Sequence, residues 1–226
     1  MRKLLIILLI ALPCSAQHHR KIFTSGGSPT VVTYCTGETY AASPQSFNCA
    51  FGSARASGDI EIVDIYADSG IAIGAPTGCV LSWTVLGTPG SGQAAYIGTS
   101  SGSGICNIAI SGSGATGQVT AAAYDLSGVI ATIDGTPTYS HPAYCTNCTG
   151  PSTTTTTNGD MVLTFISQIS LYTVTPTGTP LFVVDFTNAS VTDTGSHFVQ
   201  STYGAIDMTW SWSGAAPYCF IVAVKP

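Results

Sequence analysis

The segment from Ile206 to Ser213 alternates strictly between apolar and polar side chains. In an extended strand Ile206, Met208, Trp210 and Trp212 lie on one face, and the polar residues between them lie on the other. A period of two does not fit an α-helix, whose apolar residues recur every three to four positions. The alternation therefore predicts a β-strand with one face in a core.

No segment has a convincing helical period, and short runs rich in β-branched and aromatic residues recur between Gly, Pro, Ser and Asn. Phe182, Val184 and Phe186 are expected on one face, opposite Val183 and Asp185. The run 219–224 is apolar at every position, which predicts a central strand covered on both faces. We expect strands at Thr30–Cys35, Ser46–Phe51, Asp59–Tyr66, Cys79–Leu86, Ala94–Gly98, Gly104–Ile110, Gly117–Tyr124, Asp160–Ile169, Leu181–Phe186, His197–Tyr203, Ile206–Ser213 and Pro217–Val224.

These strands predict an all-β protein: a single antiparallel two-sheet β-sandwich over residues 30–226, jelly-roll or immunoglobulin-like and stapled by disulfides. Hydrophobic residues make up 45% of the chain, which argues against disorder outside the termini and loops. Thr153–Thr157 is too short for a mucin-like stalk, and we interpret it as an extended lead-in to the next strand.

The first 16 residues have the form of a secretory signal peptide. Arg2 and Lys3 are basic, an apolar run follows over residues 4–12, and Ala16 ends a small-residue cleavage site. The apolar run is shorter than the roughly 20 residues that a spanning helix needs, so no permanent membrane anchor is expected. We expect a flexible arm at residues 17–29 and a secreted or cell-surface location. The alternative, a lipoprotein modified at Cys14, is disfavoured by Pro13.

Charged residues make up only 8% of the chain, with a net charge of −5, where soluble proteins average about a quarter. A surface of this kind has no basic stripe to neutralise phosphates, so nucleic-acid binding is not expected.

Three stretches, in order, resemble a group of secreted bacterial β-sandwich proteins. They are GDIEIVDIYAD at 58–68, TTTTTNGDMVLTFIS at 153–167 and YGAIDMTWSWSGAAPYCFIVAVKP at 203–226. The similarity extends from Ser46 to Pro226. The group has no well-established activity, so the resemblance implies fold and location and not function.

Export makes disulfides the default interpretation of the cysteines that remain after cleavage. We predict the pairs Cys35–Cys49, Cys79–Cys106 and Cys145–Cys148, with Cys219 as a buried free thiol. Cys145 and Cys148 form a C-x-x-C motif, which can also be a redox centre or half of a zinc site. The motif lies among Pro, Asn and Gly, and only His141 is a nearby further ligand, so a structural disulfide loop is favoured.

No catalytic constellation is visible: there is no G-x-S-x-G elbow or H-E-x-x-H motif, and the histidines are isolated. No cofactor and no metal are predicted. Asp64 and Asp68 are calcium candidates near a strand end, although plain solvated carboxylates are the preferred interpretation.

Planar rings on a sandwich surface suit sugar faces, so the loop tyrosines are the candidate ligand contacts: Tyr40, Tyr96, Tyr139, Tyr144 and Tyr203. The leading hypothesis is a non-catalytic interaction module that binds glycans or another envelope component, as in adhesion. The alternative is a self-associating structural subunit of an extracellular fibre or surface layer.

Overall fold

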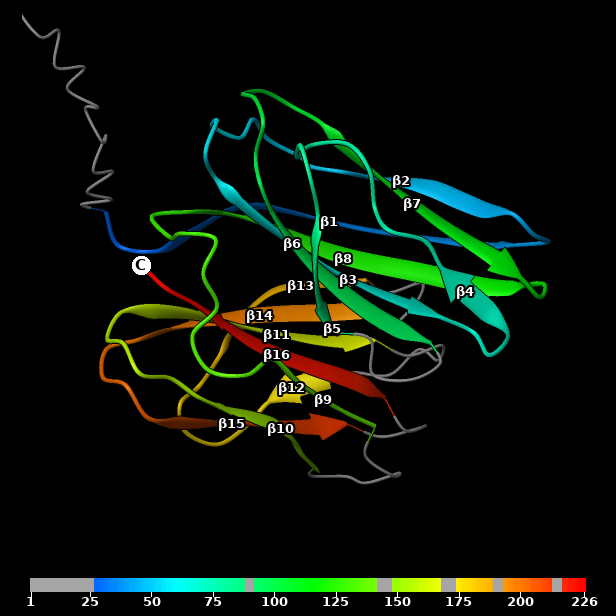
Figure 1. Ribbon diagram of the computed structural model, residues 1–226. Coiled ribbons are helices and arrows are strands. Elements are labelled where there is room, and N and C mark those ends of the chain that lie inside the picture. The colour runs from blue at the N-terminus through cyan, green and yellow to red at the C-terminus, as the bar shows by residue number, and fades with distance from the viewer. Residues whose placement is uncertain (1–26, 88–91, 142–147, 168–173, 189–192, 213–216) are drawn as a thin grey trace, which may run out of the picture.

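The computed structural model describes residues 27–87, 92–141, 148–167, 174–188, 193–212 and 217–226 (Figure 1). In these ranges the regular elements are all β-strands, and no helix is long and apolar enough to cross a membrane. The first eight strands are β1 (Thr30–Ala41), β2 (Gln45–Ala50), β3 (Ile60–Ala67), β4 (Ile71–Ile73), β5 (Thr84–Gly87), β6 (Gln93–Thr99), β7 (Asn107–Gly114) and β8 (Gly117–Ser127). The next eight are β9 (Thr138–Ser140), β10 (Cys148–Thr154), β11 (Asp160–Ser167), β12 (Val174–Pro176), β13 (Val183–Asn188), β14 (Asp193–Gln200), β15 (Ala205–Trp212) and β16 (Tyr218–Val224).

All strand pairs are antiparallel, as predicted, but the strands form four sheets where the sequence analysis expected two. The first inner sheet has the order β1-β8-β3-β6-β5, and the first outer sheet is β2-β7-β4. The second inner sheet has the order β13-β14-β11-β16-β9, and the second outer sheet is β10-β15-β12. Figure 1 shows the two inner sheets between the two outer ones.

Three apolar cores fill the spaces between the four layers. Ile65 of β3 and Ile108 of β7 belong to the core between the first inner and first outer sheets. Ile62 of β3 and Leu163 of β11 belong to the core between the two inner sheets. Ile221 of β16 packs with the second outer sheet in the third core. The inner sheets are therefore covered on both faces, and β3, β8 and β11 are buried along their lengths.

The second half of the chain repeats the strand order of the first. Adding eight to each strand number converts the first inner sheet into the second and the first outer sheet into the second. The central strands β3 and β11 both follow a Gly-Asp pair, Gly58-Asp59 and Gly159-Asp160. The two halves contact each other through their inner sheets, so that β1 lies beside β13.

Most of the expected strands are present, with the boundaries displaced by a few residues. The final apolar run forms β16, which is flanked by β11 and β9 as a central strand should be. Ile206, Met208 and Trp210 are buried together, as predicted, and the side chain of Trp212 lies outside the described residues. The expected strand at Cys79–Leu86 was too long, since β5 begins only at Thr84.

One predicted face is wrong. Phe182 and Phe186 are buried, but Val184 is exposed and does not share a face with them. The register of β13 against β14 shifts between Val184 and Phe186, so Asp185 is the extra residue of a β-bulge. The bulge breaks the alternation and places Phe182 and Phe186 in two different cores.

The Thr-rich lead-in is held by hydrogen bonds. Asp134, which is buried, accepts from the backbone N–H groups of Thr156 and Thr157 and from the Thr156 hydroxyl, each at 2.7 Å. These bonds hold the pKa of Asp134 well below its usual range despite burial. Thr155 donates to Gln200 at 2.6 Å. The stretch is thus an ordered extension that leads into β11.

Two of the predicted disulfides are present. Cys35–Cys49 joins β1 to β2, and so links an inner sheet to an outer one. Cys79–Cys106 joins two segments that precede β5 and β7. Disulfides persist in oxidising compartments, so these two indicate an oxidising environment. Cys219 is free and buried, as expected, and burial raises the pKa of its thiol to about 12.

Candidate functional site

A groove runs along the seam where the edge strand β1 of the first half meets the edge strand β13 of the second. We call it the seam groove; its lining residues are Pro29 to Tyr34, Gly52, Asp185 and His197. Its volume of about 570 Å³ lies within the range of about 300–1,000 Å³ that is usual for small-molecule sites. Both strands that border it are irregular, because the register of β1 against β8 also shifts, between Val31 and Thr33.

A histidine and an aspartate form a hydrogen-bonded pair in this groove. Nδ1 of His197 lies 2.8 Å from Oδ1 and 2.9 Å from Oδ2 of Asp185. A carboxylate only accepts hydrogen bonds, so Nδ1 carries the proton and donates. Among the described residues Nε2 of His197 has no hydrogen-bond partner, so it can bond to a ligand in the groove.

The buried Tyr124 also hydrogen-bonds to Asp185. The hydroxyl of Tyr124 donates to Oδ2 of Asp185 at 2.8 Å. Burial and the nearby carboxylate raise the pKa of Tyr124 well above its usual range, so the phenol keeps its proton and remains a donor. Gly195 makes this approach possible, because a Cβ there would overlap the Tyr124 hydroxyl and the Phe186 ring. Asp185 is therefore fixed by two donors.

The same bulge that broke the predicted alternation turns Asp185 toward the groove. Edge-strand bulges commonly re-aim a side chain next to a functional site. Tyr34, on β1, is also part of the lining. The residue is 43% exposed, and the centroid of its ring lies 4.9 Å from the centroid of the Phe186 ring. The groove thus combines one exposed aromatic ring with a carboxylate fixed by two donors and an imidazole nitrogen that no described residue hydrogen-bonds.

The corresponding seam on the other side of the molecule is apolar. There, Leu86 occupies the bulge of β5 that matches Asp185 in β13. Ile97 occupies the position on β6 that matches His197 on β14, since each pairs with the corresponding residue of β3 or β11. Tyr139 from β9 partly fills this seam, with its ring 4.4 Å from Phe220 and its hydroxyl donating to Gly87 at 2.9 Å. The polar pair is thus confined to one of two equivalent places.

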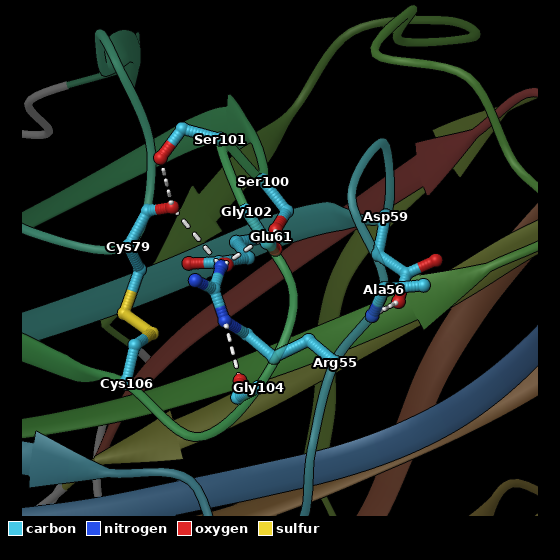
Figure 2. A network of polar contacts seen from close by, with 10 residues as sticks. All are labelled: Arg55, Ala56, Asp59, Glu61, Cys79, Ser100, Ser101, Gly102, Gly104 and Cys106. Atoms are coloured by element: carbon cyan, nitrogen blue, oxygen red, sulfur yellow. Dashed lines mark hydrogen bonds and ion pairs between the residues drawn. A yellow bond between two sulfur atoms is a disulfide. The ribbon is translucent and has the colours of Figure 1, made fainter.

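A second polar cluster lies inside the first half (Figure 2). Buried Arg55 forms an ion pair with buried Glu61, and its guanidinium also donates to the Ser100 hydroxyl at 2.7 Å and the Cys79 carbonyl at 3.0 Å. Asp125 lies directly opposite Glu61 on β8, and neither of its oxygens has a hydrogen-bond partner among the described residues. Burial raises the pKa of Glu61 to about 7 although Arg55 opposes the shift. Burial and the neighbouring acids raise the pKa of Asp125 to about 7.

Asp64 is not a solvated carboxylate, and this corrects the preferred sequence interpretation. It is buried between the two inner sheets, accepts a hydrogen bond from Gln93 at 2.9 Å, and has its pKa raised to about 8 by burial. Asp68 is half-exposed and accepts from the backbone N–H of Gln118 at 2.8 Å. Asp64 was misread because a two-sheet sandwich would leave one face of β3 in water, whereas the second half covers it.

The predicted tyrosine contacts do not form one surface. Tyr40 and Tyr203 are exposed, at 74% and 62%, and neither lines the seam groove. Tyr96 is buried, which contradicts its prediction as a ligand contact, and Tyr139 is half-buried and packs in the opposite seam. Tyr144 and the pair Cys145–Cys148 were also predicted; Tyr144, Cys145 and the side chain of Cys148 lie outside the described residues.

The sequence analysis did not identify Tyr34, Asp185 or His197 as site residues. It treated His197 as isolated, because its partner Asp185 lies on a different strand and only the bulge brings the two together. Comparison of the chain with protein-family models, curated proteins and solved structures finds no match.

Proposed function

We propose that this protein is an exported, non-catalytic glycan-binding module and that the seam groove holds the sugar. The observation that carries the proposal is the exposed Tyr34 ring beside the fixed Asp185 carboxylate and Nε2 of His197, which has no hydrogen-bond partner within the described ranges. A sugar presents an apolar face that packs on an aromatic ring and hydroxyls that both donate and accept. The groove offers a matching ring, acceptor and imidazole.

The fold is consistent with this use. We propose that each half is an eight-stranded jelly roll, because the order β1-β8-β3-β6 beside β2-β7-β4 recurs in the second half. Jelly rolls occur in lectin domains, an argument by analogy that concerns the scaffold and not the site. The two disulfides support export, and the resemblance to secreted bacterial β-sandwich proteins points the same way.

Replacing Tyr34 by alanine is expected to weaken glycan binding at least about tenfold, or about 1.4 kcal/mol, because the ring supplies the apolar contact. A glycan array and sedimentation with isolated cell-wall polysaccharide would identify the ligand, and titration would give the affinity. Tyr203→Ala is the matched control, since Tyr203 is exposed but lies outside the groove. Absence of binding on both assays, or a loss in Tyr203→Ala but not in Tyr34→Ala, contradicts the proposal.

The second candidate is a structural subunit that adds a strand to a neighbouring copy. It is favoured by β13, which is at the edge of its sheet: Val183 and Val184 of this strand are exposed, and so is Leu181 just before it. An unpaired edge with apolar side chains is a template for strand addition. In this hypothesis residues 17–29 of one copy supply the strand that is added to the sheet edge of the next copy. Electron microscopy and size-exclusion chromatography test it. Fibres or oligomers that are lost when residues 17–29 are removed support it, and a monomer unchanged by that removal contradicts it.

A further inference from the structure

The disulfide Cys79–Cys106 lies against a buried carboxylic acid. One carboxylate oxygen of Glu61 and the sulfur atoms of Cys79 and Cys106 all lie within 4.8 Å of one another. Figure 2 shows the disulfide beside Glu61 and Arg55. The other disulfide, Cys35–Cys49, is not part of such a group among the described residues. An acid at this distance can exchange a proton with a sulfur atom after a small side-chain movement.

The two disulfides also differ in their access to solvent. Cys35 and Cys49 are both buried. Cys79 is buried too, but Cys106 is half-buried and follows Ile105, which is 71% exposed. An attacking thiolate must approach one sulfur along the S–S bond, so it reaches Cys106 first and leaves Cys79 as the departing sulfur.

The departing side of the bond is organised by the Arg55 cluster. Cys79 has φ of 62°, a left-handed conformation that a residue with a side chain rarely adopts. Its carbonyl accepts from Arg55 and from the Ser101 hydroxyl, both at 3.0 Å. These bonds fix the Cys79 backbone next to a guanidinium, and a nearby positive charge stabilises a thiolate.

We infer that Cys79–Cys106 is a thiol-reactive disulfide, which small thiols open at Cys106 while Glu61 protonates the departing sulfur of Cys79. In the first step a thiolate bonds to Cys106 Sγ, the S–S bond breaks, and its electron pair remains on Cys79 Sγ, which takes the Glu61 proton. In the second step another thiolate attacks the mixed disulfide and releases the Cys106 thiolate, which water protonates. The protein disulfide gains two electrons and two thiols are oxidised to one disulfide.

Glu61 suits this role around neutral pH. Burial raises its pKa to about 7, so a substantial fraction of the side chain carries a proton there. As the pH rises above 7 the donor is lost, although the attacking thiolate becomes more abundant. The rate constant for opening, divided by the thiolate concentration, is therefore expected to fall as the pH rises through about 7.

The test is reduction of the whole protein by glutathione, quenched by alkylation and mapped by peptide mass. We expect Cys79–Cys106 to open at least about tenfold faster than Cys35–Cys49, with the first glutathione adduct on Cys106. Glu61→Gln should slow opening about tenfold relative to Cys35–Cys49 and flatten the pH profile. Glu38→Gln is the matched control, because Glu38 on β1 accepts a hydrogen bond from Gln118 at 2.7 Å and does not belong to the group formed by Glu61 and Cys79–Cys106. Its effect is judged on the opening rate of Cys79–Cys106 itself, since Glu38 shares β1 with Cys35.

Equal opening rates for the two disulfides in the wild-type protein, or a first adduct on Cys79, overturn the inference. So does a folded Glu61→Gln variant with an unchanged rate and pH profile. If Glu61→Gln unfolds, its two disulfides open at equal rates; the wild-type adduct position and pH profile then decide the inference by themselves.

Discussion

Replacing Arg55 by alanine is expected to lower the free energy of unfolding by about 3–5 kcal/mol at pH 8. Arg55 and Glu61 are both buried, so the variant leaves an uncompensated carboxylate where water does not reach it. Asp125, opposite Glu61, loses the same positive neighbour. The acceptors at Ser100 and the carbonyls of Cys79 and Gly104 also lose a donor. Chemical denaturation followed by tryptophan fluorescence measures the change.

Two further variants test whether the uncompensated carboxylate, rather than the loss of a side chain as such, causes the destabilisation. The double variant Arg55→Met with Glu61→Leu replaces the buried ion pair by apolar side chains. It should recover most of the free energy of unfolding that Arg55→Ala loses, because no charge is left unpaired. Lys225→Ala deletes a cation that lies 3.8 Å from Asp134 with a partly exposed side chain, and it should cost at most about 1 kcal/mol. If Arg55→Ala costs no more than Lys225→Ala, the buried cluster does not stabilise the fold as described.

The second large effect concerns how the free energy of unfolding depends on pH. Stability is expected to rise by a few kcal/mol as the pH is lowered from about 8 to about 5.5. Five buried acids have a raised pKa: about 7 for Glu61, Asp125, Asp160 and Asp193, and about 8 for Asp64. A raised pKa means that the folded protein holds these protons more tightly than the unfolded chain. Their contribution is complete below the ordinary carboxyl values near 4 and is lost as the pH rises through 7 to 8.

Asp134 behaves in the opposite way, because its pKa is lowered. Its contribution is lost only as the pH falls below the ordinary value of 3.8, outside the window of interest. Denaturation midpoints at pH 5.5, 6.5 and 8 measure the slope. Asp64→Asn should reduce it, and Asp207→Asn, at an exposed position on β15, should not. A protein that is more stable at pH 8 than at pH 5.5 contradicts the burial of these acids.

The fold class followed from the sequence because local patterns determine it. The alternation at Ile206–Trp210 and the continuous apolar run of β16 are properties of single strands. The number of layers is not such a property. A continuous run predicts cover on both faces but does not reveal whether that cover is a second sheet or a second half of the chain. Asp64 shows the consequence, since only the second half buries it.

The internal repeat was missed because the matched positions carry different side chains. The Gly-Asp pairs before β3 and β11 match, but the site positions do not: Leu86 stands at the position equivalent to Asp185, and Ile97 at the position equivalent to His197. The same differences explain why the site was not found. Asp185 bonds to His197 because of a bulge that no local sequence pattern predicts. Tyr34, in the same groove, comes from a strand more than a hundred residues earlier.

The repeat also supplies the variant that tests the binding site most directly. Asp185→Leu with His197→Ile gives the seam groove the residues of its apolar counterpart, which the same fold already accommodates. Titration with the glycan that the array identifies should show binding lost in this variant. The variant should still unfold in one cooperative transition at pH 8, with a midpoint below that of the wild-type protein because the buried Tyr124 hydroxyl loses its acceptor. Undiminished glycan binding by the folded variant would contradict the seam groove as the site.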